Sequence, residues 1–290
     1  MENFLRPIYQ ERASDPKTLG ILMMEKTNPN SPLTDNFDII LLIIVKEAEQ
    51  EWFVKHYESA GETAAMHIVK ESTLMDWIDT SSSRRAVEWV INGRVVYDRN
   101  EYISDLKRKL RDFPLQQRNL RKAIEFGKLV KSYNEAKALF TSKNYKDAHS
   151  KVFYSLHYLA RLAVVEKGYY PEVTVWNQVK NIDLEIYKLY EEFIDSREEM
   201  EKKIQLMILA MDYVINHRAA ASAEHLLNIM RTKGEPWSYA ELKTNPFVEP
   251  YKLDLSAIIS YLEEKEIILP VLEETKGVGV FHRKYRISNF

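Results

Sequence analysis

Residues 18–45 read TLGILMMEKTNPNSPLTDNFDIILLIIV, and this stretch decides the fold of the first part of the chain. Two apolar runs, Leu19–Met24 and Ile39–Val45, flank a polar loop that contains two prolines. The second run is seven consecutive aliphatic residues rich in β-branched isoleucine, which favours a strand buried on both faces. The first run is either a neighbouring strand or the end of a helix. Asp35 and Asp38 are therefore expected at the entrance to a central strand.

Two aspartates at the start of a buried strand are typical of metal-dependent phosphate chemistry. Carboxylate oxygens are hard ligands that suit Mg²⁺, and a strand fixes the direction in which they project. The pattern indicates Asp35 and Asp38 as candidate metal ligands and catalytic residues. The alternative is that both side chains only make the local hydrogen bonds that Asp often forms in turns.

Composition narrows the classes of protein that fit. The 290 residues carry a net charge of −2 and a pI near 6.4, so no global positive field attracts nucleic acid or anionic lipid. The absence of cysteine removes disulfides, thiolate nucleophiles and cysteine-bound zinc. The N-terminal residues lack the apolar core of a signal peptide, and no apolar run approaches the roughly 20 residues that cross a bilayer. We therefore expect a cytoplasmic protein with no membrane partner.

Short strands and helices alternate through the first 113 residues. Strands are expected at 19–24, 39–45, 52–55, 64–69 and 95–97, and helices at 1–14, 72–80, 84–92 and 102–113. Ser83 is the expected N-cap of the helix that starts at Arg84. Such alternation over about 100 residues predicts an α/β or α+β unit with its own core.

A turn followed by Asp-Asn-x-Asp and an aliphatic strand resembles the nucleotidyltransferase superfamily, whose fold is that of DNA polymerase β. The segment INGRVVYD, residues 91–98, is similar to the Gly-x-Val-Leu-Tyr-Asp strand and turn of small members of that superfamily. With the rest of the chain, these features resemble a bacterial nucleotidyltransferase-like family. Its members join such a domain to a helical substrate-binding-type domain and a C-terminal winged helix-turn-helix. The resemblance implies Mg²⁺, a nucleoside triphosphate (NTP) and transfer of a nucleoside monophosphate to an unidentified acceptor.

Several positions depart from the superfamily pattern. If Asp38 is the second family aspartate, the first falls on Asn36, whose amide supplies no negative charge. Using Asp35 instead gives Asp-x-x-Asp, and residues three apart on a strand do not share a face unless a bulge intervenes. The family Gly-Ser falls near Met24-Glu25, where glycine would give phosphates room and Glu25 would repel them.

A third acid of the superfamily belongs on a following strand, for which 64–69 is the candidate. This segment offers His67 and no carboxylate. By the resemblance, Glu25, Asn36 and His67 occupy positions that would face the cofactor. The substitutions predict a degenerate active site, with catalysis reduced or lost.

From residue 116 the pattern becomes helical. Helices are expected at 118–141, 145–167, 183–195, 197–216 and 219–232, with Gly168 ending the second. Five aromatic side chains in this part either line a pocket for a base or sugar or pack in the core: Tyr154, Tyr158, Tyr169, Tyr170 and Trp176.

The C-terminal pattern is that of a winged helix. Helices at 239–243 and 255–265 precede a hairpin formed by 267–272 and 278–287, and Ser238 is the expected cap of the first helix. The second helix would read DNA in such a fold, but its end is rich in glutamate, the wrong sign for phosphate. Contact with DNA or RNA is therefore weakly supported, and a packing or protein-contact role is favoured.

We thus expect an α+β chain with three domains: a nucleotidyltransferase-like mixed sheet with helices (1–115), an all-α substrate-binding-type domain (116–232) and a winged helix-turn-helix (233–290). In the enzyme hypothesis, Asp35 and Asp38 hold Mg²⁺, which binds an NTP. In the alternative, the chain is a catalytically inactive nucleotide- or partner-binding scaffold. A winged-helix DNA-binding regulator is a third and weaker hypothesis.

Overall fold

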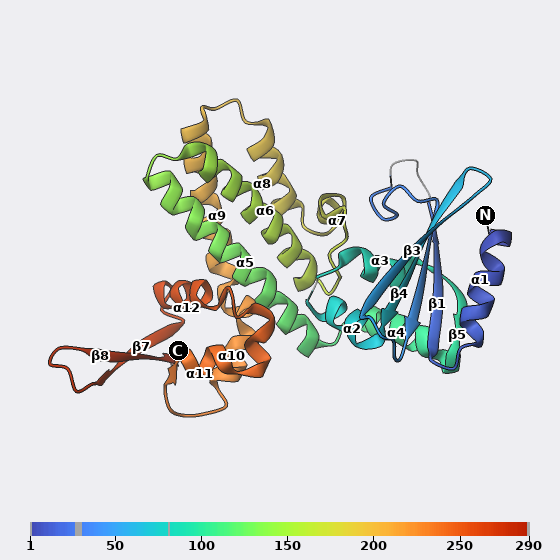
Figure 1. Ribbon diagram of the computed structural model, residues 1–290. Helices are drawn as coiled ribbons and strands as arrows, with labels where there is room; N and C mark the ends of the chain where they lie inside the picture. The colour runs from blue at the N-terminus through green and yellow to red at the C-terminus, as the bar shows by residue number, and fades with distance from the viewer. Residues whose placement is uncertain (1, 27–30, 81, 289–290) are drawn as a thin grey trace. The chain divides into compact units, whose positions relative to one another are not determined.

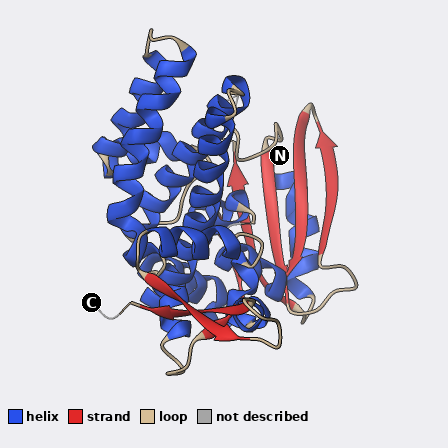
Figure 2. Ribbon diagram, turned by 90° about the vertical axis from the view of Figure 1, so that its left-hand side faces the viewer, coloured by secondary structure: helices blue, strands red, loops and turns tan. Residues whose placement is uncertain are grey.

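The computed structural model describes residues 2–26, 31–80 and 82–288, and the chain separates into two compact units. The first unit comprises Met1–Pro114 with Pro171–Thr174, and the second comprises Leu115–Tyr170 with Val175–Phe290. Each unit has its own sheet, of five strands in the first and three in the second (Figures 1 and 2).

A mixed sheet in the order β3-β4-β2-β1-β5 forms the centre of the first unit. Its strands are β1 (Thr18–Glu25), β2 (Ile39–Val45), β3 (Trp52–Ser59), β4 (Glu62–Lys70) and β5 (Arg94–Asp98). All seven residues of β2 are buried, as expected for a middle strand in a sheet covered on both faces. β2 pairs in parallel with β4 and antiparallel with β1, which confirms the central strand predicted from the aliphatic run.

Helices cover both faces of this sheet (Figure 1). The odd-numbered side chains of β2 pack with Leu5 of α1 (Glu2–Ser14). The opposite face is covered by α2 (Glu71–Thr80), α3 (Arg84–Asn92) and α4 (Tyr102–Asp112), which follows η1 (Arg99–Glu101). Ile103 of α4 lies so close to Gly20 of β1 that a Cβ at this glycine would collide with it. Glycine at this position therefore lets α4 reach the backbone of the sheet.

Two local expectations for the first unit need correction. Ser83 occupies the N-cap of α3, but its side chain makes no capping hydrogen bond. The strand expected at 52–55 continues to Ser59, because β3 forms a hairpin with β4. The two turn residues, Ala60 and Gly61, have φ values of 53° and 81°, as a tight hairpin turn requires.

The second unit begins with a helical bundle. Its helices are α5 (Leu115–Thr141), α6 (Tyr145–Glu166), α7 (Val175–Ile182), α8 (Leu184–Asp195), α9 (Met200–Ser222) and α10 (Glu224–Met230). The break expected near Ala219 is wrong, since α9 continues to Ser222, and α7 was not expected at all. Gly168 has a φ of 86° and its N–H donates to the Val165 carbonyl at 2.9 Å, so it ends α6 as predicted.

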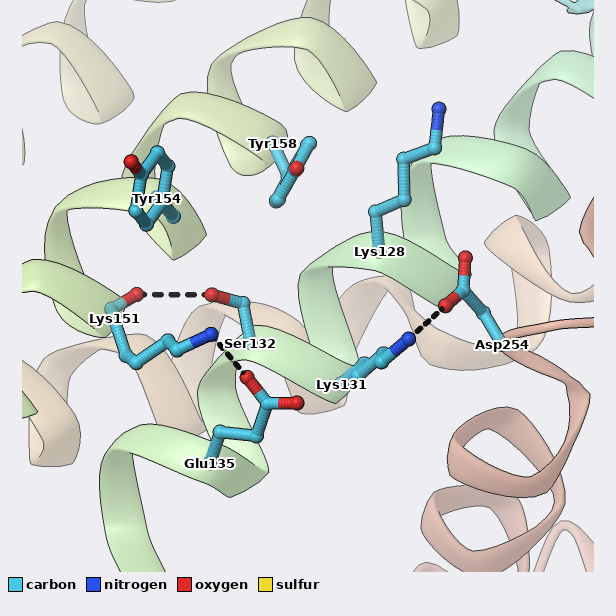
Figure 3. A pocket seen from close by; sticks show the side chains of 8 residues that line it. All are labelled: Lys128, Lys131, Ser132, Glu135, Lys151, Tyr154, Tyr158 and Asp254. Carbon is cyan, nitrogen blue, oxygen red and sulfur yellow. Dashed lines mark hydrogen bonds and ion pairs between the residues drawn. The ribbon is translucent and has the colours of Figure 1, made fainter. Parts of the chain in front are cut away.

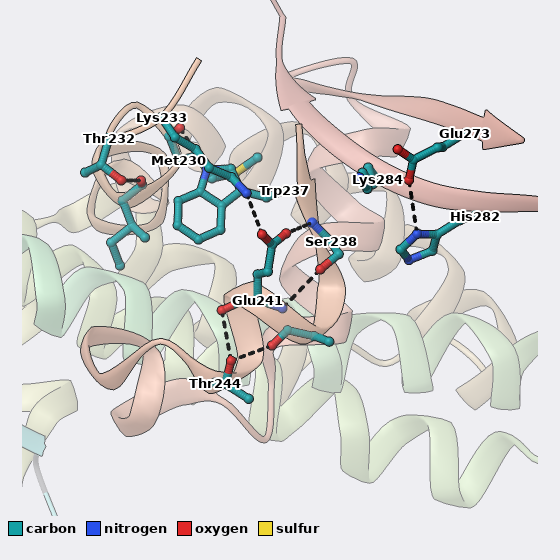
Figure 4. Close-up of polar contacts among 12 residues, drawn as sticks. Met230, Thr232, Lys233, Trp237, Ser238, Glu241, Thr244, Glu273, His282 and Lys284 are labelled. Carbon is teal, nitrogen blue, oxygen red and sulfur yellow. Dashed lines mark hydrogen bonds and ion pairs between the residues drawn. The ribbon is translucent and has the colours of Figure 1, made fainter. Parts of the chain in front are cut away.

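The winged helix completes the second unit. It contains β6 (Trp237–Ser238), α11 (Tyr239–Thr244), η2 (Pro246–Tyr251), α12 (Leu255–Glu264), β7 (Ile268–Glu274) and β8 (Phe281–Ile287), with strand order β6-β8-β7. Ser238 caps α11 as expected, because its hydroxyl accepts from the Glu241 N–H and its own N–H donates to the Glu241 carboxylate (Figure 4). A hydrogen bond from Lys233, together with those from Ser238, lowers the pKa of Glu241 to about 2.

One hydrophobic core joins the helical bundle to the winged helix. Its buried members run from Ala123 of α5 to Ile268 of β7. α12 approaches α5 closely, since a Cβ at Gly127 would lie 3.0 Å from the Cβ of Asp254 and 3.1 Å from Cδ1 of Ile258. The boundary predicted after residue 232 therefore falls within a continuous core, and the three-domain division stays a prediction.

The architecture confirms the expected α+β class, with a mixed sheet, a helical middle and a winged helix. Among the described residues, none of the helices combines the length and the apolar composition needed to cross a membrane.

Candidate functional site

The loop that enters β2 is held by its backbone. Asp35 and Asn36 have φ values of 47° and 71°, a left-handed conformation that Asn and Asp tolerate better than most residues. The Leu33 carbonyl accepts a hydrogen bond of 2.7 Å from Nε1 of Trp89 on α3. We call residues 31–38 the acidic loop. Residues 27–30, which precede it, lie outside the described residues and contain no His, Cys, Asp or Glu.

At the end of this loop, Asp38 forms hydrogen bonds that link three strands. Its carboxylate accepts from the Thr63 N–H at 2.8 Å and from the Thr63 hydroxyl at 3.1 Å. Its own N–H donates to the Thr63 carbonyl, and its carbonyl accepts from the Lys26 N–H. The hydrogen bonds from Thr63 hold the pKa of Asp38 below its usual value, with a further contribution from the charge of Lys26. Asp38 thus acts as a bridge between β2, β4 and β1.

Asp35 forms an ion pair with Arg85 of α3, and both side chains are about half exposed. The Asn36 carbonyl accepts a long hydrogen bond of 3.4 Å from the Lys26 ammonium. Two protein cations, Arg85 and Lys26, therefore already bind the acidic loop.

Glu25 lies on the other side of the sheet from His67. In the strand register, Glu25 shares a face with Met23 and the α1 core, and its carboxylate lies 3.7 Å from Arg94. His67 pairs with Leu42 and points toward the face covered by α2, α3 and α4. The structure therefore brings His67 near Asp35 and does not bring Glu25 to the same place.

His67 is buried in a cluster of tryptophans. Its Nδ1 accepts a hydrogen bond of 3.1 Å from Nε1 of Trp52, and its ring centre lies 4.7 Å from that of Trp89. Burial lowers the pKa of His67 to about 4; Asp35 opposes this shift, while His56 and Arg85 add to it. His67 is therefore neutral at pH 7 and carries its proton on Nε2.

Aromatic side chains extend this cluster to the surface. Trp52 is half exposed and packs edge-on against Trp77, with ring centres 5.3 Å apart. Phe37 and His56 form a second pair, with ring centres 4.6 Å apart. Sequence reasoning missed Trp52, because its contact with His67 depends on the β3–β4 register. The Ala60-Gly61 turn was the signal that could have set this register.

The donor set at the acidic loop does not fit a magnesium ion. The Asp35 carboxylate is bound by Arg85, and the Asp38 carboxylate is bound by two donors of Thr63. Within the described part of the chain, no group of three or more His, Cys, Asp or Glu side chains is arranged to hold a metal. Mg²⁺ is usually bound by one or two carboxylates together with waters and substrate phosphates, and here both candidate carboxylates already have protein partners.

The winged helix offers little positive charge to a nucleic acid. α12 packs against α5 through Ile258 and Tyr261, and Tyr261 meets Phe126 edge-on at 5.9 Å. At the acidic C-terminal end of α12, Glu263 forms an ion pair with Arg283 of β8. On the wing, Glu273 pairs with Lys284 at 2.8 Å and lies 3.5 Å from His282 (Figure 4).

Comparisons with known proteins match most of the chain in three parts. Family models match a nucleotidyltransferase-like domain at residues 1–118, a YgxA-like substrate binding domain at 119–218 and a helix-turn-helix domain at 224–287. The YgxA protein of Bacillus subtilis (strain 168) is 44% identical over 285 residues, which are 98% of this chain and 97% of that protein. The crystal structure of a nucleotidyltransferase-like protein from Exiguobacterium sibiricum 255-15 is 37% identical, with a TM-score of 0.82 and 99% of each chain covered. The predicted resemblance is thus confirmed, and the chain belongs to the family of nucleotidyltransferase-like proteins with a YgxA-like substrate binding domain and a helix-turn-helix domain.

Proposed function

We propose that this nucleotidyltransferase-like protein binds a nucleotide without catalysing metal-dependent transfer. The observation that carries the proposal is the state of the two candidate catalytic carboxylates. Asp35 is neutralised by Arg85, and Asp38 is used to join β2 to β4 through Thr63. Proteins of this fold generally use an NTP and a divalent metal, but here Arg85 binds Asp35 and Lys26 binds the Asn36 carbonyl.

The surroundings of the loop support binding of a nucleotide. Trp52 is half exposed, and stacking of a base on its indole would contribute about 1–3 kcal/mol. Arg85 approaches the same cluster closely enough to lower the pKa of His67, and its guanidinium suits a phosphate. A phosphate that binds Arg85 would compete with Asp35 and would need no metal ion.

The test is a calorimetric titration of the full chain with ATP and with GTP, in one buffer that contains Mg²⁺ and in another that contains EDTA. We expect binding in both buffers, with dissociation constants that agree within about threefold, because Arg85 and Trp52 supply the contacts. Trp52→Ala should weaken binding about tenfold or more, whereas Asp38→Asn should leave it unchanged. Phe53→Ala, which removes a neighbouring exposed ring of β3, is the matched control.

The enzyme hypothesis gives the opposite result. Binding that requires Mg²⁺ and is lost in Asp38→Ala, together with release of pyrophosphate from the NTP, would overturn the proposal. The proposal would also be overturned if neither ATP nor GTP bound in either buffer.

Nucleic-acid contact through the helix-turn-helix domain stays a prediction. The pairing of Arg283 with Glu263 and of Lys284 with Glu273 supports a packing role for this domain instead.

A further inference from the structure

The α5–α6 helix pair contains buried charge at a place where helices normally pack apolar side chains. Glu125 of α5 is fully buried and pairs with Arg161 of α6 at 2.5 Å, and the Arg161 side chain is only 8% exposed. Within the described chain, Oε2 of Glu125 and Nε of Arg161 have no hydrogen-bond partner. Buried ionic groups are costly when incompletely paired, so their presence indicates a role other than stability. We call Glu125, Lys128, Ser132 and Arg161 the polar seam.

The polar seam continues into a pocket of about 280 Å³ (Figure 3). Lys128 follows Glu125 by three residues and precedes Ser132 by four, so all three share one face of α5. The pocket is completed by Tyr154 and Tyr158 of α6 and by Asp254, which immediately precedes α12. The winged helix thus contributes one wall of a pocket that otherwise belongs to the helical bundle.

Lys128 is the unpaired cation of this pocket. Lys131 pairs with Asp254 at 3.0 Å, and Lys151 pairs with Glu135 at 2.6 Å. Among the described residues, Lys128 makes no hydrogen bond or ion pair, although burial lowers the pKa of its ammonium. Three lysines against two carboxylates leave the lining with an excess positive charge, which favours an anionic ligand.

Two tyrosine rings of α6 also line the pocket, whose lysines Lys128 and Lys131 come from α5. Tyr154 and Tyr158 are one turn apart on α6, and Tyr154 is 54% exposed. The Arg161 guanidinium lies 5.7 Å from the ring centre of Tyr158 and supports that ring from the polar seam. A flat ring can therefore stack on the tyrosines while an attached anion reaches Lys128.

We propose that this pocket binds a small phosphorylated compound that carries a flat ring, of the class of a nucleoside monophosphate. The volume lies near the lower end for ligand pockets, so a monophosphate suits it better than a triphosphate. Lys128 binds the phosphate, Tyr154 and Tyr158 stack on the ring, and Ser132 has a hydroxyl at the pocket wall. The site is separate from the acidic loop and does not depend on the function proposed for it.

The test is calorimetry of the full chain with AMP, CMP, GMP and UMP, with inorganic phosphate and the free nucleosides as partial ligands. We expect at least one monophosphate to bind with a dissociation constant below about 1 mM, and the partial ligands to bind about tenfold more weakly or not at all. Lys128→Met should weaken that binding about tenfold or more while the melting temperature is kept or raised, because a partly buried ammonium without a partner is removed.

Three controls locate the binding. Lys146→Met removes an exposed lysine of α6 outside the pocket and should bind as the wild type does. Tyr158→Leu should weaken the monophosphate more than inorganic phosphate. Trp52→Ala, in the first unit, should leave the Lys128-dependent binding unchanged. This variant therefore distinguishes a failure of the proposed pocket from a failure of nucleotide binding at the acidic loop.

Absence of binding by all four monophosphates would overturn the proposal, as would a Lys128→Met variant that binds as the wild type does. Inorganic phosphate that binds as tightly as the monophosphates would overturn the part assigned to the tyrosine rings.

Discussion

The acidic loop and the polar seam use charge in opposite ways. In the loop, Asp35 and Asp38 are accessible, and each has a protein partner in Arg85 or Thr63. In the seam, the Glu125 carboxylate is fully buried and keeps one oxygen without a partner. Exposed ion pairs contribute little to stability, whereas buried charges cost several kcal/mol unless they are fully paired.

The two regions show that resemblance to a family and local physical chemistry can indicate different sites in the same chain. The loop is where the nucleotidyltransferase pattern places the candidate catalytic residues, and its two carboxylates bind Arg85 and Thr63. The seam carries no superfamily motif, but it holds charges that a purely structural helix pair would not need. Residues retained at a cost to stability are a better indication of a ligand site than residues that merely occupy the expected positions.

The largest expected effect comes from breaking the polar seam. Glu125→Leu removes the only carboxylate that pairs with Arg161 among the described residues and leaves that guanidinium and the Lys128 ammonium close together. We expect the free energy of unfolding to fall by about 3–5 kcal/mol, as is typical when one member of a buried pair is removed. Denaturant unfolding of the second unit, followed by Trp176 and Trp237 fluorescence, measures the change.

The double variant Glu125→Leu/Arg161→Met is the control for this prediction. It removes both charges, so most of the lost stability should return. A double variant as unstable as Glu125→Leu would show that the side chains act through packing, and the contrast between seam and loop would lose its basis.

Much of the fold could be predicted because local patterns were unambiguous. β2 spans Ile39–Val45 and α3 spans Arg84–Asn92, as the aliphatic run and the helical periodicity indicated. α7 was missed because Pro171 and the β-branched residues Val173-Thr174-Val175 suggest an extended segment. Its helix is set by burial of Val175 and Val179, which are four residues apart.

The candidate sites were predictable only in part, because their contacts depend on pairing between elements. Asp38 could be placed at the entrance to β2, but its partner Thr63 lies 25 residues away on the parallel strand. The sequence offers Tyr154 and Tyr158 either as pocket residues or as core residues. It does not offer Lys128, since only the packing of α5 on α6 shows that it shares their pocket.

A second effect, next in size, concerns His67 beside the acidic loop. Its pKa is about 4 in the folded protein and near 6.5 when unfolded, so the unfolded state binds a proton first as pH falls. The contribution of His67 to stability should therefore decrease by about 3 kcal/mol as pH falls from 6.5 to about 4, and His67 itself should cause no further change well below pH 4.

The variant His67→Gln keeps an acceptor for Nε1 of Trp52 and does not titrate. Unfolding free energies measured from pH 7 to pH 4 should fall less steeply for this variant than for the wild type. The comparison isolates His67, because burial also lowers the pKa values of His149 and His225 and both remain in the variant. Parallel profiles for the two proteins would contradict the buried, neutral state of His67.

The smallest expected effect is at Asp38, and it decides what the acidic loop does. Because Thr63 holds the pKa of Asp38 below 3.8, the stability from this carboxylate is present above that pH and is lost as pH falls through the lower folded value. Asp38→Asn still offers an oxygen to Thr63, so the melting temperature at pH 7 should change by only about 1–3 °C, and the acid-dependent part should disappear. A bridge between strands predicts this result together with unchanged ATP binding. A catalytic aspartate predicts an intact fold with loss of Mg²⁺-dependent ATP binding, so thermal melts at pH 7 and pH 3 combined with calorimetry distinguish the two roles in one variant.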